Sequence, residues 1–257
     1  MSTTKVGQRA VSFHEEAGDG TGQTVLMVHG ATDHSWIWKN QMRGIDGRHR
    51  RISVDLPGRI GTGGPPIDNA EDFRTFIAGF ADHVKLKPFV FVGHSMGGSM
   101  ALDFAAHLED QLVGFAMVGS SPRWELESSH IELLRNEPVK GIQVANDDFG
   151  LFSKHTAQSV RDELYREAER VPAQTGAADL IACTTYDLEA SLDKIGLPAL
   201  VICGDEDPGS LPGSQLCAAR LRGASFEQIE RCGHSIMVEQ PDVLTRALNE
   251  FLDALQS

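Results

Sequence analysis

The chain has 257 residues, of which 41% are hydrophobic and 23% are charged. This length and composition are typical of a globular protein with one large domain, or with one domain that carries an insertion. No apolar run approaches the roughly 20 residues that a membrane-spanning helix requires, so we expect no membrane span. The formal net charge of −13 argues against nucleic acid as a partner, because phosphate backbones are negative too.

The N-terminus and the cysteines both bear on the cellular compartment. The first ten residues contain no apolar stretch of the roughly 7 to 15 residues that a secretory signal needs. Cys183, Cys203, Cys217 and Cys232 show neither a Cys-x-x-Cys pair nor a histidine at zinc-finger spacing. We therefore expect free thiols in a reducing compartment, and hence a cytoplasmic protein.

Short apolar, β-branched runs alternate with helical patterns in the first half of the chain, which indicates βαβ units and a mainly parallel sheet. Three of these runs end at a glycine-bearing turn, and functional residues usually gather at such strand ends. Similar strand signals return toward the C-terminus. We expect strands at residues 24–28, 51–55, 89–92, 112–118, 199–203 and 225–230.

Helices are expected between and after these strands. Apolar residues recur at three- and four-residue spacing from Phe73 to Val84, which indicates a single apolar face that packs on the sheet. Residues 96–108 also have a helical pattern. A closing helix with one apolar face is expected after Pro241.

The rhythm of strands and helices changes at Pro122. From there to residue 195 the sequence contains no convincing strand, only polar helical stretches such as residues 156–170. The strand signals then resume. We therefore predict a core formed by residues 1–121 and 196–257, with residues 122–195 inserted as a helical subdomain.

A G-x-S-x-G pattern occupies residues 93–97, directly after a predicted strand and directly before a predicted helix. In this context the pattern predicts a sharp turn that exposes the hydroxyl of Ser95, because the glycines remove Cβ atoms where strand and helix nearly touch. The helix N-terminus would also offer backbone N–H groups to an anion. The alternative interpretation is a glycine-rich turn with an incidental serine.

A serine hydroxyl is a weak nucleophile at neutral pH, so this hypothesis requires a histidine base and a carboxylate that orients it. Of the ten histidines, His234 alone follows a predicted core strand in the order serine, acid, histidine. Residues 204–207 follow another core strand and contain two candidate acids, Asp205 and Asp207. The position of Asp207 deeper in the loop gives it the reach to His234. Asp205 is expected to bond loop N–H groups instead.

Other interpretations of these residues are weaker. A solvated acidic turn and a satisfied Gly-His pair would explain the acid and histidine segments if each stood alone. His94 is a competing base, but adjacent residues at such a turn point in different directions. His29, Asp33 and His34 could suggest metal ligands, yet their spacing matches no site that we can name, so we expect no metal.

Together these motifs resemble those of the α/β-hydrolase superfamily, and the resemblance covers nearly the whole chain outside the insert. The matching segments follow the order of that family and are residues 29–31, 55–58, 93–98, 204–207 and 233–234. The resemblance implies an α/β-hydrolase fold, a mainly parallel sheet with helices on both faces. It also implies that residues 122–195 form a helical cap.

The resemblance further implies roles for five residues. Ser95 would be the nucleophile, His234 the base and Asp207 the orienting acid. The backbone N–H groups of Ala31 and Met96 would form the oxyanion hole.

Two further features lie near the predicted site. Residues 58–61 carry one residue more than the Gly-x-Gly that is common in this loop of the family, so we do not expect the loop to keep the family's shape. Trp36, Arg123 and Trp124 are candidates for lining the pocket, whereas we expect Trp38 to pack in the core.

The function that the resemblance implies is that of a carboxylesterase-like serine hydrolase. It would act on a small-molecule ester through an acyl-enzyme on Ser95, without a cofactor or a metal. Carbon–carbon bond hydrolysis, lactone opening and acyl transfer use the same triad and stay open as alternatives, and a low-turnover ligand receptor is an alternative from a different class. A serine nucleophile disfavours the chemistry of haloalkane dehalogenases and epoxide hydrolases, which attack through a carboxylate. The sequence does not reveal the oligomeric state.

Overall fold

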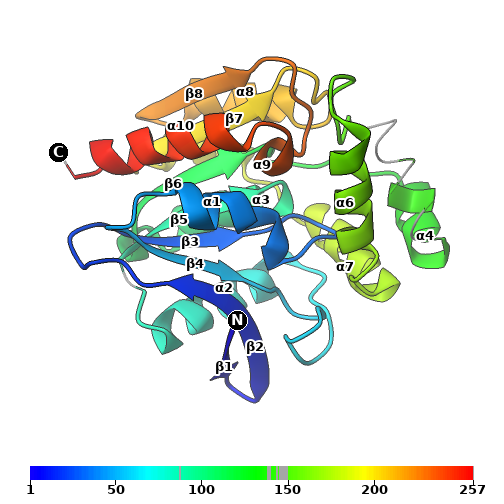
Figure 1. The fold of residues 1–257 in the computed structure, drawn as a ribbon, viewed down its shortest axis with the longest axis horizontal. Coiled ribbons are helices and arrows are strands. Elements are labelled where there is room, and N and C mark those ends of the chain that lie inside the picture. Colours follow the sequence, from blue (N-terminus) through cyan, green and yellow to red (C-terminus); the bar gives the residue numbers. More distant parts are fainter. Residues whose placement is uncertain (87, 138–139, 143, 145–149, 257) are drawn as a thin grey trace.

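The chain folds around one eight-stranded sheet (Figure 1). The computed structural model describes residues 1–86, 88–137, 140–142, 144 and 150–256. The strands lie in the order β1-β2-β4-β3-β5-β6-β7-β8. Their bounds are β1 (Ser2–Val6), β2 (Arg9–Glu16), β3 (Thr24–Val28), β4 (Arg50–Val54), β5 (Phe89–His94), β6 (Leu112–Val118), β7 (Ala199–Gly204) and β8 (Ala224–Ile229).

The direction of the strands determines where the helices go. β1 pairs with β2, and β2 with β4, in antiparallel fashion, whereas the pairs that join β4 through to β8 are parallel. Parallel strands need crossover connections, and these put helices on both faces of the sheet. The helices around the sheet are η1 (Ser35–Trp38), α1 (Lys39–Gly44), α2 (Ala70–His83), α3 (Met96–His107), η2 (Glu109–Gln111), α8 (Leu211–Arg220), α9 (Ile236–Glu239) and α10 (Pro241–Ala254).

Both faces of the central strands are buried. In β5, Phe89 and Phe91 point to one face, and the ring centroid of each lies 5.8 Å from that of Phe104 in α3. Val90 and Val92 point to the other face and belong to the apolar cluster that includes residues of α10. Burial on both faces explains why these strands are continuous apolar runs in the sequence.

The predicted fold class is confirmed, because the sheet is mainly parallel and helices cover both of its faces. The predicted strands correspond to β3 through β8, with ends that differ by at most two residues. The predicted helices correspond to α2, α3 and α10. The hairpin of β1 and β2 was not predicted, since β1 is short, largely exposed and without an apolar run.

A second group of helices lies between β6 and β7. They are α4 (Ser128–Asn136), α6 (Gln158–Ala168), α7 (Ala173–Cys183) and η3 (Glu189–Lys194). Figure 1 shows α4, α6 and α7 together, beyond the end of the sheet to which the arrow of β3 points. In the described part of residues 122–195 there is no β-strand, and the backbone forms β-type hydrogen bonds only in an isolated bridge between Arg123 and Asp187. Residues 138–139, 143 and 145–149 of the predicted insert lie outside the described residues, and the division into domains stays a prediction.

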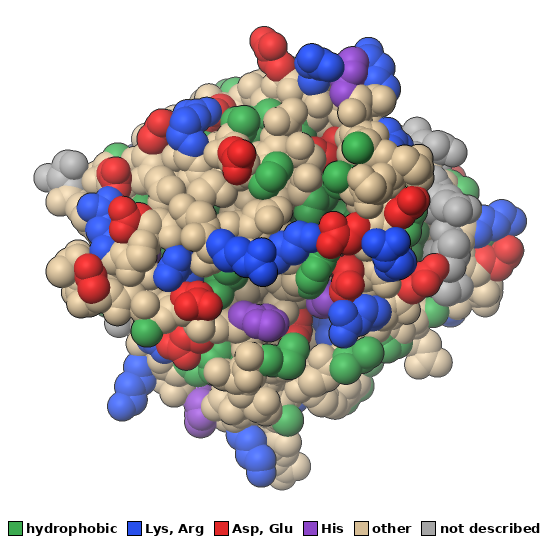
Figure 2. Space-filling view, in the orientation of Figure 1, with side chains coloured by type: hydrophobic (Ala, Val, Ile, Leu, Met, Phe, Trp, Pro, Cys, Tyr) green, Lys and Arg blue, Asp and Glu red, His purple; other side chains and the backbone are tan. Residues whose placement is uncertain are grey.

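The surface carries charges of both signs. On the face that bears α1 and α10, acidic and basic side chains are interspersed, so the net charge of −13 is not gathered into one patch there (Figure 2). Within the described residues, no helix combines the length and the apolar character that crossing a bilayer requires. The four cysteines are free, as predicted, and all four are buried.

Candidate active site

Ser95 lies at a sharp turn between β5 and α3. Its backbone adopts φ 53° and ψ −118°, a conformation that residues other than glycine rarely adopt. Two hydrogen bonds hold the turn: the N–H of Ser95 donates to the carbonyl of Val118 at 2.9 Å, and the Ser120 hydroxyl donates to the carbonyl of Ser95 at 2.7 Å. Every other residue of 91–100 is buried, whereas Ser95 is partly exposed. The turn therefore presents its side chain, as the G-x-S-x-G pattern predicts.

Glycines let the elements around this turn approach closely. A Cβ atom on Gly93 would collide with the carbonyl oxygen of Gly97. A Cβ atom on Gly30 would lie 2.9 Å from the Cβ of Ser95, which is closer than real side chains pack. The loop after β3 therefore passes directly beside the serine, and this approach requires glycine at position 30.

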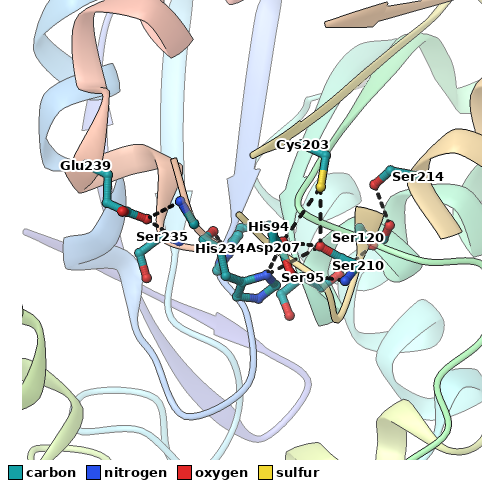
Figure 3. A network of polar contacts seen from close by, with 11 residues as sticks. His94, Ser95, Ser120, Cys203, Asp207, Ser210, Ser214, His234, Ser235 and Glu239 are labelled. Carbon is teal, nitrogen blue, oxygen red and sulfur yellow. Dashed lines mark hydrogen bonds and ion pairs between the residues drawn. The ribbon is translucent and has the colours of Figure 1, made fainter. Parts of the chain in front are cut away.

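His234 and Asp207 form a buried pair after the ends of β8 and β7. Nδ1 of His234 lies 2.8 Å from Oδ2 of Asp207 (Figure 3). Because an ionised carboxylate only accepts hydrogen bonds, Nδ1 carries the proton, and Nε2 is the nitrogen left to accept one. His234 and Ser95 line the same cavity.

Ser210 and Cys203 hold Asp207 in place. The N–H of Ser210 donates to Oδ1 at 3.1 Å, and the Ser210 hydroxyl donates to Oδ2. The thiol of Cys203 also donates to Oδ2, at 3.7 Å, and burial raises the pKa of this thiol to about 12, so it stays protonated. Sequence reasoning missed Ser210. The turn signal of Pro208 and Gly209 between the aspartate and the serine could have indicated this contact.

The electrostatics of this pair favour an ionised acid and a strengthened base. Burial alone raises the pKa of Asp207, but His234 and the hydrogen bonds of Ser210 outweigh it, and the pKa falls below its ordinary value. Burial alone lowers the pKa of His234, but the carboxylate of Asp207 outweighs it, with a further contribution from Glu239. The pKa of His234 is therefore raised above 6.5.

His94 supports the backbone at His234 through Nε2. Its Nε2 lies 3.1 Å from the carbonyl oxygen of His234, and the two ring centroids are 4.7 Å apart. A carbonyl only accepts, so Nε2 carries the hydrogen. Burial, together with the neighbouring His234, lowers the pKa of His94 well below 6.5, which keeps the ring neutral.

Asp205 points away from the histidine. Its Oδ1 accepts the N–H of Cys232 at 3.1 Å, and its own N–H donates to the carbonyl of Ile229 at 2.9 Å. The residue is exposed. The structure thus brings Asp207 to His234 and leaves Asp205 in contact with loop backbone.

Ala31 and Met96, the predicted oxyanion-hole residues, are the neighbours of Ser95 in space and in sequence. Met96 is the first residue of α3, so its N–H has no partner one turn back in the helix. Ala31 lines the cavity together with Ser95. The next residue, Thr32, has φ 60° and donates its N–H to Oδ2 of Asp179 at 3.0 Å. The carboxylate of Asp179, in α7, therefore holds the loop that carries Ala31. The role of Ala31 in an oxyanion hole stays a prediction.

A cavity of about 130 Å³ lies between Ser95 and the helices of the cap. Trp124 lines it, whereas Trp36 and Arg123 line two outer grooves. Trp38 is fully buried in the core. Most of the lining is apolar and comes from the cap, through Leu126, Leu134, Ile142, Leu151, Leu164 and Leu180.

The histidines considered as metal ligands are engaged by other protein groups. Nδ1 of His29 donates to the carbonyl of Gly30 at 2.8 Å, and its Nε2 accepts the N–H of Leu56 at 3.2 Å. Nε2 of His34 lies 3.0 Å from Oε2 of Glu167. In the part of the chain that the structure describes, no group of three or more side chains could hold a metal ion.

Comparison with known proteins decides the family. The sequence pattern of the Alpha/beta hydrolase family matches residues 25–247. The chain belongs to the alpha/beta hydrolase family. It is 25% identical to monoacylglycerol lipase abhd6-B of Xenopus laevis over 263 aligned residues, which cover 93% of this chain and 77% of that protein.

Solved structures resemble this alpha/beta hydrolase along nearly its whole length. The TM-score with the enol-lactonase from Burkholderia xenovorans LB400 is 0.88 at 19% identity, covering 98% of this chain and 100% of that one. The TM-score with a thermophilic esterase from Thermogutta terrifontis is 0.86 at 25% identity, covering 99% of this chain and 97% of that one. The fold is that of the family.

In this alpha/beta hydrolase the loop at residues 58–61 carries one residue more than a Gly-x-Gly pattern. Both glycines of the loop have positive φ, 88° and 95°, which turns Arg59 inward and leaves Ile60 66% exposed. Nη1 of Arg59 donates to Oδ1 of Asp179 in α7 at 3.1 Å, and both side chains are almost completely buried. Because Asp179 also accepts the N–H of Thr32, this ion pair connects the cap to the loop beside Ser95.

Proposed function

We propose that this alpha/beta hydrolase cleaves carboxylic esters through an acyl-enzyme on Ser95. The observation that carries the proposal is a shared cavity: Ser95 lines it with His234, whose Nδ1 donates to the buried carboxylate of Asp207 at 2.8 Å. A histidine base and a carboxylate that orients it are what a serine hydroxyl needs to become a nucleophile. The relative named as a monoacylglycerol lipase and the structure named as an esterase support the choice of esters.

In the proposed reaction, Nε2 of His234 takes the hydroxyl proton while Oγ of Ser95 attacks the carbonyl carbon. The carbonyl electron pair moves to oxygen, and the N–H groups of Ala31 and Met96 stabilise the oxyanion, each by roughly 10²- to 10³-fold in rate. Collapse of this intermediate expels the alcohol, which takes the proton from His234. Water then repeats the same steps on the acyl-enzyme and releases the acid.

The cavity suggests the size and polarity of the acyl group. Its lining is mostly apolar, and its volume of about 130 Å³ is close to the roughly 150 Å³ of an apolar cavity that holds benzene. We therefore propose esters with a short apolar acyl chain as the preferred substrates.

The test of this function uses an irreversible phosphonate and a panel of chromogenic esters graded in acyl length, with a lactone included. We expect one phosphonate adduct, on the peptide that contains Ser95, and loss of ester hydrolysis in parallel with its formation. A preference for the lactone would redirect the proposal to lactone opening. An inert protein that binds a small ligand tightly would favour the receptor alternative.

The pH dependence of kcat/KM is expected to follow His234. Only the neutral imidazole accepts the proton of Ser95, and the pKa of His234 is raised above 6.5 by Asp207. Activity should therefore be full on the alkaline side and fall, as the pH decreases, with an apparent pKa above 6.5. A profile that is flat from about pH 5 to 9 would contradict a histidine base.

Asp33 is the group to separate from His234 in this profile. Burial raises the pKa of Asp33 to about 7, and the residue lines the cavity. Asp33→Asn removes this titration and keeps the size of the side chain. We expect kcat/KM of Asp33→Asn to fall at low pH with the same apparent pKa as that of the wild type. A different apparent pKa in this variant would assign the fall in activity to Asp33.

Trp124 is expected to limit the length of the acyl chain. It lines both the cavity and an outer groove of about 510 Å³, and its Nε1–H donates to the hydroxyl of Ser99 at 2.7 Å. Trp124→Ala should join the two spaces and shift kcat/KM several-fold toward longer acyl chains, measured from acetate to dodecanoate. Trp124→Phe keeps most of the wall and serves as the control. Identical chain-length profiles for Trp124→Ala and wild type would remove this residue from the pocket.

A further inference from the structure

A glutamate outside the triad holds the loop that carries His234. Glu239 is the last residue of α9, and its Oε1 accepts the main-chain N–H groups of Gly233 and Ser235, each at 3.1 Å. These two residues flank His234 in the chain. One carboxylate oxygen therefore fixes the peptide groups on both sides of the proposed base (Figure 3).

The other oxygen of Glu239 binds the cap. Oε2 accepts the N–H of Ser153 at 2.7 Å and the hydroxyl of Thr156. Both residues lie on the segment that leads into α6, so the carboxylate joins this cap helix to the loop of His234. All four partners are donors, which favours the ionised form of Glu239.

The same cap segment also bonds directly to the loop. The N–H of His234 donates to the carbonyl of Gly150 at 3.0 Å, and the N–H of Ser235 donates to that of Leu151 at 3.1 Å. The main chain at His234 thus lies between Glu239 and the cap. The N–H of Ser235 is shared between Oε1 of Glu239 and the carbonyl of Leu151. A shift of Glu239 would leave the N–H of Gly233 unpaired, and a shift of the cap segment would leave that of His234 unpaired, which is costly for buried groups.

Charged and titratable groups from several elements face these two residues. Burial raises the pKa of Glu239, although its hydrogen bonds act in the opposite direction. The negative charge of Glu239 contributes to the raised pKa of His234. The surrounding groups are Asp207 and His94 beside His234, and Cys232, His155, Arg231 and Arg161 beside Glu239 or its partners.

We propose that Glu239 is a positioning residue that couples the cap to the base. It sets the orientation of His234 through the peptide groups on either side, and its own placement depends on Ser153 and Thr156 of the cap. A displacement of the cap that withdraws these donors changes the support of His234. The inference rests on the function proposed above, in which His234 is the base.

Glu239→Gln tests the proposal, because it keeps the size of the side chain but removes its charge and one of its two acceptor oxygens. We expect kcat on a chromogenic ester to fall roughly 10- to 100-fold, the effect of a small displacement of a catalytic group. KM should change little, since the apolar cavity is untouched. The acid limb of the pH profile should move to lower pH, because His234 loses a negative neighbour.

Glu206→Gln is the matched control. Oε2 of Glu206 accepts the N–H of Lys154 at 3.0 Å, so this glutamate holds the same cap segment. Its remaining charged contacts are with the side chains of Lys154 and His155, on the outer side of the segment. We expect kcat and the acid limb of this variant to stay near those of the wild type.

The coupling is also measured without any ester. The Cε1–H resonance of His234, assigned by its loss in His234→Gln, is followed in an NMR titration of wild type and Glu239→Gln. A lower pKa of His234 in the variant supports the proposal. If the wild type neither hydrolyses esters nor reacts with the phosphonate, the proposed function fails, whereas this titration still decides whether Glu239 acts on His234.

Equal kcat, acid limb and His234 pKa in Glu239→Gln and wild type would overturn the positioning role, even if the melting temperature fell. Should that variant not fold, Thr156→Val takes its place, since it removes one donor to Oε2 and keeps the charge of Glu239. Its kcat is expected to fall several-fold at unchanged KM. An unchanged kcat in Thr156→Val would overturn the coupling to the cap.

Discussion

Ser95→Ala should abolish ester hydrolysis and leave the fold unchanged. The substitution removes only a hydroxyl group. Two hydrogen bonds hold the turn, from the N–H of Ser95 to the carbonyl of Val118 and from the Ser120 hydroxyl to the carbonyl of Ser95. Neither involves the Ser95 hydroxyl, so both remain. Loss of the nucleophile from a serine-protease triad lowers kcat by about 10⁶-fold, so we expect a fall of that order.

The measurements are turnover of a chromogenic ester, formation of the phosphonate adduct, and thermal melting. Ser225→Ala is the control, because the Ser225 hydroxyl contacts the carbonyl of Ala199 at the start of β7, at the opposite end of the parallel strands from Ser95. It should keep wild-type activity. Hydrolysis by Ser95→Ala at the wild-type rate would contradict the serine mechanism.

The sheet and the turn at Ser95 could be predicted because their signals are local. Strands buried on both faces are continuous apolar runs, as residues 89–92 show, and such runs are visible without knowledge of their neighbours. The turn at Ser95 joins a strand and a helix that are adjacent in sequence. The β1–β2 hairpin gave no such signal, because Ser2–Val6 lies largely exposed at the edge of the sheet.

The groups that support the site could not be predicted, because their contacts join distant parts of the chain. Glu239 contacts Ser153, 86 positions away, and Arg59 contacts Asp179, 120 positions away. Glu239 lies in a short helix and Arg59 in a loop. Polar side chains at such places are normally solvated, so nothing in the sequence predicts these contacts. The extra residue of loop 58–61 was visible, but the burial of Arg59 depends on a cap carboxylate that no spacing rule connects to it.

Asp207→Asn should lower kcat by about 10⁴-fold, the effect known for the equivalent substitution in a serine protease. An asparagine offers one acceptor oxygen and one NH₂ donor. If the NH₂ group takes the place of Oδ1, it faces the N–H of Ser210. If it takes the place of Oδ2, it faces the donors of His234, Ser210 and Cys203. In that second orientation the repulsion between NH₂ and Nδ1–H ends when the proton of His234 moves to Nε2, and that tautomer cannot accept the proton of Ser95.

Asp205→Asn should keep most of the activity. Oδ1 of Asp205 accepts the N–H of Cys232 at 3.1 Å, and an amide oxygen accepts this bond equally well. Since Asp205 is exposed, the new NH₂ group would face water. Two substitutions of the same chemistry, two positions apart, therefore have opposite expected effects.

The deciding measurement is kcat of both variants at a pH above the pKa of His234, where the wild-type imidazole is neutral, together with thermal melting. Asp207→Asn should lose turnover while still melting cooperatively, because the buried side chain keeps its size and part of its hydrogen bonding.

The stability of Asp207→Asn and that of the wild type should also depend differently on pH. The pKa of Asp207 is below its ordinary value, so its charged form stabilises the native state at pH values above that ordinary value. This contribution is lost as the pH falls through the lowered pKa. The acid-induced loss of stability should therefore be smaller in Asp207→Asn than in the wild type. A large loss of kcat in Asp205→Asn, with Asp207→Asn near wild type, would assign the acid to Asp205 and leave the roles of Ser95 and His234 intact.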